Sequence, residues 1–242
     1  MIVGELYSLL NEISPFELQE KWDNSGLLVG NMDDEFENIY ICLDLDMDVL
    51  DQIPSSSAII THHPLIFSPL KRVNYDSYAT IILRELIKKD ITLISMHTNF
   101  DKTHLNKYVA SEVLGLELEE GEDFICYAKV DKPFDEFTKE ISEKLNLKHP
   151  KTVKCNEIIK KVGLTTGSGM SLLPYVKADC FLTGDIKYHD AMEAKLRGVS
   201  LIDIDHYESE KFFSPLLEGL LSKYLKKNQL NDIISVLKNP FN

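Results

Sequence analysis

The feature that most constrains the fold is a repeated alternation of short apolar segments with longer stretches of helical spacing. The longest unbroken apolar runs, Ile39–Leu43 and Phe124–Ala128, have five residues each. Such short runs are typical of buried β-strands, and they are far shorter than the ~20 residues that a membrane-spanning helix requires. The alternation predicts an α/β protein without a transmembrane segment.

Seven strands and two helices are predicted from this pattern. The strands are Ile39–Leu43, Ala58–Thr61, Thr92–Met96, Phe124–Lys129, Ile159–Leu164, Cys180–Thr183 and Ser200–Asp203. One helix is predicted over Ala79–Lys89. The apolar spacing from Phe212 to Leu221 predicts a long amphipathic helix near the C-terminus.

No repeat, low-complexity tract or flexible linker divides the chain, whose 242 residues fit one large or two modest domains. The acidic stretch Leu116–Asp123 is too charged for a core segment and leads into a predicted strand, so it is the best candidate for a boundary. We therefore expect two closely packed α/β lobes. Residues 1–123 with residues 198–242 form an N-terminal lobe completed by the C-terminal helix, and residues 124–197 form a second lobe.

Acidic side chains outnumber basic ones, 39 to 26, which gives a formal net charge of −13 and a pI near 5.0. A surface of this sign repels duplex nucleic acid and anionic membranes, so both are disfavoured as partners. The first residues lack the basic charge of a secretory signal. The four cysteines are scattered without a C-x-x-C pair, which favours reduced thiols, and we expect a cytoplasmic protein.

Histidines are few and unevenly placed. Of the seven, four lie in three short polar clusters, His62–His63, His97–Asp101 and His206–Glu210, and each cluster follows a predicted strand. Ligand sites of open α/β sheets usually form at strand ends. The three clusters are therefore candidates to converge on one site.

The adjacent histidines need a strand end to serve one site, because neighbouring residues on a regular strand point to opposite faces. Pro64 supplies that end, since proline cannot donate to a sheet ladder and biases the preceding residue towards extended geometry. The imidazoles of His62 and His63 are then splayed, which suits two metals better than one. An incidental pair of loop histidines is the alternative.

The other two clusters also leave alternatives open. His97 and Asp101 would share one face of a helical turn, whereas an extended chain would align His97, Asn99 and Asp101. A turn with its own hydrogen bonds would explain the same motif. His206 and Glu210 have i, i+4 spacing at the predicted start of the last helix, a spacing that is also common on solvated helices.

Together, the three clusters offer nitrogen and oxygen donors without sulfur. The candidate set is His62, His63, His97, Asp101, His206 and Glu210. Such donors suit iron, zinc, manganese, cobalt or nickel rather than copper(I) or an iron–sulfur cluster. A carboxylate can use both oxygens to bridge ions about 3.5–4 Å apart, and Glu210 is the candidate for that bridge.

Two glycine-containing turns have simpler explanations than a ligand site. Gly163–Gly169 could cradle phosphate with backbone N–H groups, but it matches neither the P-loop nor the dinucleotide fingerprint, and a tight turn alone explains it. In Thr183–His189, Asp185 is a candidate N-cap of the following helix. His189 falls one turn inside that helix and is a weak candidate for the site.

Five segments, taken in order along nearly the whole chain, form a specific pattern. They are Trp22–Gly30 (WDNSGLLVG), Thr61–Pro64 (THHP), His97–Asp101 (HTNFD), Thr183–Asp185 with His189, and His206–Glu210 (HYESE). This pattern resembles the dinuclear-metal proteins known as GTP cyclohydrolase I type 2 or NIF-three-like proteins.

The resemblance implies the NIF-three-like fold, in which two α/β lobes hold a dinuclear divalent-metal site in the cleft between them and six chains form a toroidal homohexamer. By position, the implied metal ligands are His62, His63, Asp101, His206 and Glu210. Glu210 is implied to be shared by both ions, and His97 lies beside the metals, where it moves protons or holds substrate. Asp23 and Asn24 are weak candidates for substrate binding, with packing and turn bonding as alternative roles.

The activity implied by the resemblance is that of a metal-dependent hydrolase. GTP and water are converted to 7,8-dihydroneopterin triphosphate and formate through a water molecule activated by two metal ions, with His97 as the catalytic proton shuttle. The alternatives are a two-metal phosphoesterase or damaged-nucleotide hydrolase, and a non-catalytic metal-binding scaffold or regulatory interaction protein. Two bound ions would make the cleft locally positive, so a nucleotide substrate is compatible with the acidic chain.

Overall fold

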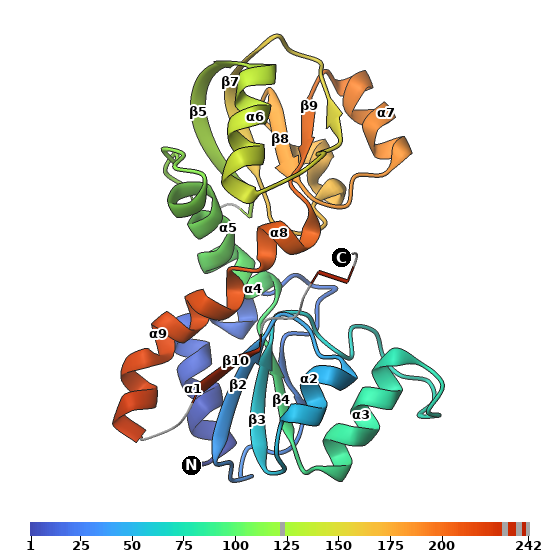
Figure 1. Cartoon of the computed structure of the whole chain (residues 1–242), viewed down its shortest axis with the longest axis vertical. Coiled ribbons are helices and arrows are strands. Elements are labelled where there is room, and N and C mark those ends of the chain that lie inside the picture. The colour runs from blue at the N-terminus through green and yellow to red at the C-terminus, as the bar shows by residue number, and fades with distance from the viewer. Residues whose placement is uncertain (122–123, 229–231, 236–238, 241–242) are drawn as a thin grey trace. The chain divides into compact units, whose positions relative to one another are not determined.

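The computed structural model describes residues 1–121, 124–228, 232–235 and 239–240 (Figure 1). It confirms the α/β class, with two five-stranded sheets. The chain divides into two compact parts: unit 1 is residues 1–100 with 213–242, and unit 2 is residues 101–212. The lobe boundaries expected after residues 123 and 197 stay a prediction. Within the described ranges, no helix is long and apolar enough to cross a membrane.

Unit 1 contains one mixed sheet and the helices that pack on it. Its strands are β1 (Gly26–Val29), β2 (Asn38–Cys42), β3 (Ser57–Thr61), β4 (Thr92–Ser95) and β10 (Asp232–Ser235). Its helices are α1 (Val3–Ile13), the short 3-10 turn η1 (Phe16–Leu18), α2 (Met47–Gln52), α3 (Tyr78–Lys88), α4 (Thr98–Phe100) and α9 (Phe213–Asn228).

The sheet of unit 1 has the strand order β1-β4-β3-β2-β10, and every neighbouring pair is parallel except β1 with β4. Both faces of its central strands are buried. On β2, Ile39 and Ile41 point to one face and Tyr40 and Cys42 to the other, and all four are at most 5% exposed. Burial on both faces explains why these strands are continuous apolar runs rather than alternating ones.

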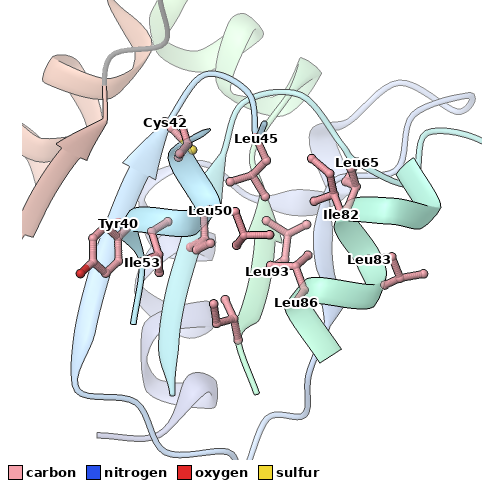
Figure 2. Packing of buried hydrophobic residues seen from close by; sticks show 13 residues of the cluster. Tyr40, Cys42, Leu45, Leu50, Ile53, Leu65, Ile82, Leu83, Leu86 and Leu93 are labelled. Carbon is pink, nitrogen blue, oxygen red and sulfur yellow. The ribbon is translucent and has the colours of Figure 1, made fainter. Parts of the chain in front are cut away.

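One face of this sheet packs against α2 and α3 (Figure 2). Leu50 of α2, Ile82 and Leu86 of α3, and Leu93 of β4 meet in this layer, and each is at most 1% exposed. Ile82 and Leu86 are four residues apart, so they lie on the same face of α3. Helix α1 lies on the opposite side of the sheet (Figure 1).

Unit 2 is built around a second mixed sheet. Its strands are β5 (Cys126–Pro133), β6 (Thr152–Val153), β7 (Ile158–Leu164), β8 (Cys180–Thr183) and β9 (Ser200–Asp203). Its helical elements are η2 (Asp101–Leu105), α5 (Asn106–Tyr108), η3 (Val109–Val113), α6 (Phe134–Leu145), η4 (Met170–Tyr175), α7 (Tyr188–Arg197) and α8 (His206–Glu210). The elements η2 and η3 are wide, π-helical turns.

The sheet of unit 2 has the order β5-β7-β8-β9-β6, with a parallel centre (β7, β8, β9) and an antiparallel strand at each edge. Phe181 of β8 and Leu201 of β9 are fully buried in its core, where Ala194 of α7 joins them. Asn146 and Gly198 end α6 and α7 in the left-handed conformation, the usual way to satisfy the last carbonyls of a helix.

The sequence pattern located every interior strand and one edge strand, β5, but it missed the other edge strands. All seven predicted strands are present, and the helix predicted over Ala79–Lys89 is α3. The three strands that were not predicted, β1, β6 and β10, all lie at sheet edges. The expectation that His206 and Glu210 begin the long C-terminal helix was wrong, because α8 ends at Glu210 and α9 begins at Phe213.

Candidate metal centre

Strands β3 and β4 of unit 1 end side by side. Thr61 and Ser95 are register partners, and their hydroxyl oxygens are joined by a hydrogen bond of 2.7 Å. Because the strands are parallel, the residues that follow them emerge at the same edge of the sheet. These residues are His62 and His63 after one strand and His97 after the other.

The three histidines bring their rings together within unit 1. One ring nitrogen of each lies within 4.8 Å of the others. The ring centroids are 5.0 Å apart for His62 and His63, 5.2 Å for His62 and His97, and 5.5 Å for His63 and His97. Imidazole nitrogens are common ligands of zinc, iron, nickel and copper, so this group is suited to hold a divalent ion.

The adjacent histidines are each anchored through Nδ1. His62 Nδ1 bonds the carbonyl oxygen of Met96 at 2.9 Å, and His63 Nδ1 bonds Asp44 Oδ2 at 2.9 Å. A carbonyl or carboxylate oxygen can only accept, so Nδ1 carries the hydrogen and Nε2 carries the lone pair. This outer hydrogen bond is the arrangement that metal-binding histidines usually have. Asp44 was not among the predicted residues.

His97 is anchored by a buried carboxylate. Its Nδ1 donates to Asp23 Oδ1 at 2.8 Å, and the Asp23 side chain is fully buried. Asp23 also accepts from the Thr98 N–H at 3.1 Å and the Ser25 hydroxyl at 3.1 Å. Burial raises the pKa of Asp23, but the hydrogen bond and charge of His97 outweigh it and hold that pKa well below its usual range. An ionised Asp23 therefore keeps the hydrogen of the neutral His97 ring on Nδ1. The lone pair is then on Nε2, which faces away from Asp23.

The backbone after His97 is helical, which decides between the two geometries that the sequence left open. Thr98–Phe100 form α4. Asn99 is buried and donates to the Ser14 carbonyl at 2.9 Å, so it links α4 to the end of α1. Asp101 begins the wide turn η2 in unit 2. Wide turns of this kind are frequent at functional sites.

Unit 2 carries a group of acidic and imidazole side chains of its own. Glu210 is 3% exposed and Asp101 is 5% exposed. One carboxylate oxygen of Asp101 lies within 4.8 Å of one of Glu210, and His206 Nε2 lies 3.0 Å from Glu210 Oε2. Two buried carboxylates at this distance repel each other, so a cation between them would remove a large electrostatic penalty.

His206 is held from both ends. Its Nδ1 lies 2.8 Å from Asp185 Oδ2, and its Nε2 faces Glu210. Burial lowers the pKa of His206, but the hydrogen bonds and charges of Glu210 and Asp185 raise it to about 10. A raised pKa favours a proton on the imidazole of His206, which then donates to Glu210. A divalent ion would replace that proton, since metal binding requires the neutral imidazole.

The structure corrects the expected role of Asp185, and it shows where His189 lies. Asp185 is not the N-cap of α7, because the helix begins at Tyr188 and Lys187 occupies the cap position. Asp185 anchors His206 instead, with a backbone φ of 57°. His189 is exposed on α7 against the ring of Tyr188, 5.4 Å away. Among the described residues, it belongs to none of the groups able to hold a metal.

The glycine-rich turn after β7 makes room for Glu210. Gly167 has a φ of +59°, and a Cβ on it would lie 2.0 Å from Glu210 Oε1 and 3.5 Å from His206 Nε2. Its N–H donates to the Ser209 hydroxyl at 3.1 Å. Gly184 has a similar role, because a Cβ there would lie 2.8 Å from the backbone nitrogen of His206. These glycines therefore allow α8 to approach the turn, which accounts for them without a phosphate.

The donor chemistry of both units fits divalent metal ions. Unit 1 offers His62, His63 and His97, and unit 2 offers Asp101, His206 and Glu210. Every imidazole in these groups has its Nδ1 fixed by an oxygen acceptor. Such anchoring fixes the tautomer and orientation that a metal ligand needs. Nitrogen and carboxylate donors without thiolate match the class of metals predicted from the sequence.

Similarity to known proteins extends over the whole chain. A family model described as Duf34/NIF3 (NGG1p interacting factor 3) matches residues 1–240. A Campylobacter jejuni protein named GTP cyclohydrolase 1 type 2 homolog is 43% identical over 242 residues, which are 100% of this chain and 99% of that protein. A Helicobacter pylori protein named GTP cyclohydrolase 1 type 2 is 44% identical over 225 residues, covering 92% of this chain and 93% of that protein.

Solved structures share the fold. A hypothetical protein of Staphylococcus aureus superposes with a TM-score of 0.82 at 28% identity, covering 100% of this chain and 99% of that chain. Reduced HcgD from Methanocaldococcus jannaschii superposes with a TM-score of 0.81 at 29% identity, covering 97% of each chain.

Proposed function

We propose, from the premise that this chain belongs to the Duf34/NIF3 family, that it is a metal-dependent hydrolase acting on a guanine nucleotide. The proposed reaction converts GTP and water to 7,8-dihydroneopterin triphosphate and formate, in line with the names of its Campylobacter and Helicobacter relatives. The observation that carries the proposal is the set of imidazoles anchored through Nδ1, together with the buried carboxylates Asp101 and Glu210.

The proposed metal site holds two divalent ions. The residues that would hold these ions are His62, His63, Asp101, His206 and Glu210. When bound, such ions supply Lewis acidity and bring the pKa of a coordinated water towards ~7. The metal is iron, zinc, manganese, cobalt or nickel, the class that nitrogen and oxygen donors select.

His97 is the proposed proton carrier. Asp23 holds its Nδ1 hydrogen at 2.8 Å, which leaves Nε2 to take a proton from the attacking water and to return it later. The ionised Asp23 also stabilises the imidazolium that forms, because it is buried and its charge is poorly screened. His97 therefore needs no metal of its own to act, although its ring lies beside His62 and His63.

The first experiment measures the metal content of the purified protein and the formate released from GTP. We expect about two ions per chain and formate release that depends on them. Glu210→Ala should lose both ions and all activity, whereas His63→Ala should lose about one ion and most activity. His149→Ala is the matched control, since His149 is an exposed loop histidine in unit 2.

Each other outcome of this experiment assigns a different function. Metal-filled protein that releases no formate from GTP would refute the cyclohydrolase proposal. Turnover of a phosphodiester or damaged-nucleotide panel by the same protein would then assign a two-metal hydrolase of another substrate. If chelation changes the assembly while no substrate is turned over, the site is that of a metal-binding scaffold.

Assembly as a homohexamer is part of the proposal. Light scattering coupled to size-exclusion chromatography measures the number of chains directly, and the expected result is six. The acidic exterior, with a formal charge of −13, predicts that nucleotide binds only to the metal-loaded protein, because the ions supply the positive charge that a triphosphate requires.

A further inference from the structure

Trp22 and Phe67 are large aromatic side chains that remain in solvent beside the histidines of unit 1. Trp22 is 58% exposed and Phe67 is 49% exposed. Their ring centroids are 5.8 Å apart, and the ring of His97 lies 6.1 Å from Trp22 and 6.3 Å from Phe67. The proton transfer and metal binding proposed above use neither ring.

The segments that carry these two rings are fixed by hydrogen bonds. Asp23 bonds the side chain of His97, and the Ser25 hydroxyl accepts from its backbone N–H at 3.1 Å. The side-chain amide of Asn24 donates to the carbonyl oxygen of Ile66 at 2.5 Å. Ile66 directly precedes Phe67 in the sequence. The residues that follow Trp22 are therefore hydrogen-bonded both to His97 and to the residue before Phe67. Segments that are already fixed lose little backbone freedom when a ligand binds, which favours affinity.

The geometry of the pair is that of a corner rather than a slot. Stacked carbon atoms are separated by about 3.5–4.0 Å, so a ring inserted between two others needs parallel planes about 7 Å apart. The planes of Trp22 and Phe67 are tilted by 50°, and their centroids are only 5.8 Å apart. A third ring can stack on the open face of one and meet the edge of the other. We call Trp22 and Phe67 the aromatic corner.

We propose that the aromatic corner binds the planar heteroaromatic ring of the substrate and holds it beside His97. This inference rests on the proposed function, in which that ring is the guanine base of GTP. A purine offers a flat π-face, and stacking on an aromatic side chain recognises this face whatever substituents the ring carries. The corner therefore positions the ring, while polar groups elsewhere select which ring is accepted.

The proposal predicts a particular kinetic signature. Stacking of the base is present in the bound substrate as well as in the transition state, so its loss raises KM and leaves kcat nearly unchanged. Loss of a group that moves a proton acts on the other constant and lowers kcat. His97→Ala and Phe67→Ala should therefore differ in which of the two constants changes.

Trp22 allows a direct binding test because it is the only tryptophan in the sequence. Titration of the purified, metal-loaded protein with GTP or guanosine should quench Trp22 fluorescence saturably. Inorganic tripolyphosphate, which has charge but no ring, should leave the emission unchanged. Emission of N-acetyltryptophanamide at the same nucleotide concentrations corrects for light absorbed by the base.

Three variants complete the test. Phe67→Ala should weaken guanosine binding roughly 5- to 150-fold, the range that loss of base stacking produces. Trp22→Phe should retain most of the affinity, and Trp22→Ala should not, as measured by the KM for GTP. Tyr75→Ala is the matched control, because Tyr75 is 55% exposed in the same segment but lies against Arg84 at 4.8 Å.

The outcomes separate this proposal from the cyclohydrolase assignment. Quenching by ring-bearing ligands without formate release would support the corner while refuting the reaction. Formate release with an unchanged KM in Phe67→Ala and Trp22→Ala would refute the corner and leave the reaction standing. A third outcome is that Trp22 emission stays the same with every nucleotide but changes when the protein is diluted and its chains dissociate. This would show that a second copy of the chain covers Trp22 and Phe67, and it would also overturn the proposal.

Discussion

Gly167→Ala tests the geometry of the acidic group of unit 2 with a single methyl group. A Cβ at this position would lie 2.0 Å from Glu210 Oε1 and 3.0 Å from its Cδ. Because non-bonded heavy atoms approach to about 3.5 Å, the carboxylate must move by at least about 1 Å. Metal sites tolerate errors of about 0.2 Å in ligand distances, so this displacement would remove Glu210 from its proposed place as a ligand.

The same substitution also strains the backbone, and that effect must be separated from the displacement. Gly167 has a φ of +59°, which costs an L-residue about 1–2 kcal/mol. Gly198 has a φ of +69° with open space around its missing Cβ. Gly198→Ala therefore carries similar backbone strain without touching Glu210, and it serves as the matched control.

We expect both variants to unfold about 2–8 °C below the wild type, from the shared backbone strain. Only Gly167→Ala should also lose metal affinity, by about 100-fold or more, as measured by calorimetric titration with Zn²⁺ or Mn²⁺. Equal metal affinity in the two variants would show that Glu210 does not hold the ion where its side chain lies, and would refute this account of the glycine.

Three further predictions concern the anchors, the surface charges and the metal. Asp185→Ala should lower metal affinity about 10- to 100-fold in the same titration, because the Nδ1 anchor of an expected ligand is lost; wild-type affinity would contradict it. Glu140→Gln should lower the free energy of unfolding at pH 7 by less than about 1 kcal/mol, because hydrogen bonds from Lys132 and Lys144 hold the pKa of that carboxyl below its usual value. A lowered pKa stabilises the fold fully above the unfolded-state pKa of about 4.3, and this contribution is lost as the pH falls through the lower folded-state pKa, so urea titrations should show the difference shrinking as the pH falls below about 4. Glu143→Gln, which removes an exposed ion pair of 3.8 Å, is the control. Removal of metal by a chelator should lower Tm by about 5–10 °C relative to protein with metal at about 100 times its Kd, and an unchanged Tm would argue against a site in the folded chain.

The interior of both sheets was predictable because burial on two faces leaves an unmistakable apolar run. The strand Ile39–Leu43 is one such run, and it forms β2. Edge strands are different, since one side of the ladder is open and fewer side chains are buried. Gly26–Val29, for example, has only one buried residue and is flanked by a glycine at φ +100°. Its continuous apolar run, Leu27–Val29, has only three residues, whereas Ile39–Leu43 has five.

The candidate ligands were predictable from residue type and strand position, but the residues that hold them were not. His63 stands out in the sequence, whereas its anchor Asp44 is one of 39 acidic residues. One signal was available: Asp44 follows β2, the strand next to β3. Asp185 has the same kind of signal, because it follows β8, the strand next to β9, but its carboxylate meets His206 through a positive backbone φ that the sequence did not predict.

The break between α8 and α9 also lay beyond the sequence pattern. His206–Glu210 and the apolar positions from Phe213 onward can be drawn on one continuous helix. Lys211 and Phe212 separate them, so α8 ends before the long helix begins. The spacing of apolar residues does not detect a two-residue interruption of this kind, because it locates the ends of helices only to within one or two residues.

The bond between His62 Nδ1 and the Met96 carbonyl has a consequence for how this chain can evolve. The other three imidazoles depend on the carboxylates of Asp23, Asp44 and Asp185, and a single codon change removes any of them. The acceptor of His62 is main chain, fixed by the pairing of β3 with β4. No substitution at Met96 deletes it. His62 thus inherits its orientation from the sheet itself, and descendants that lose every acidic anchor would still retain one correctly aimed imidazole.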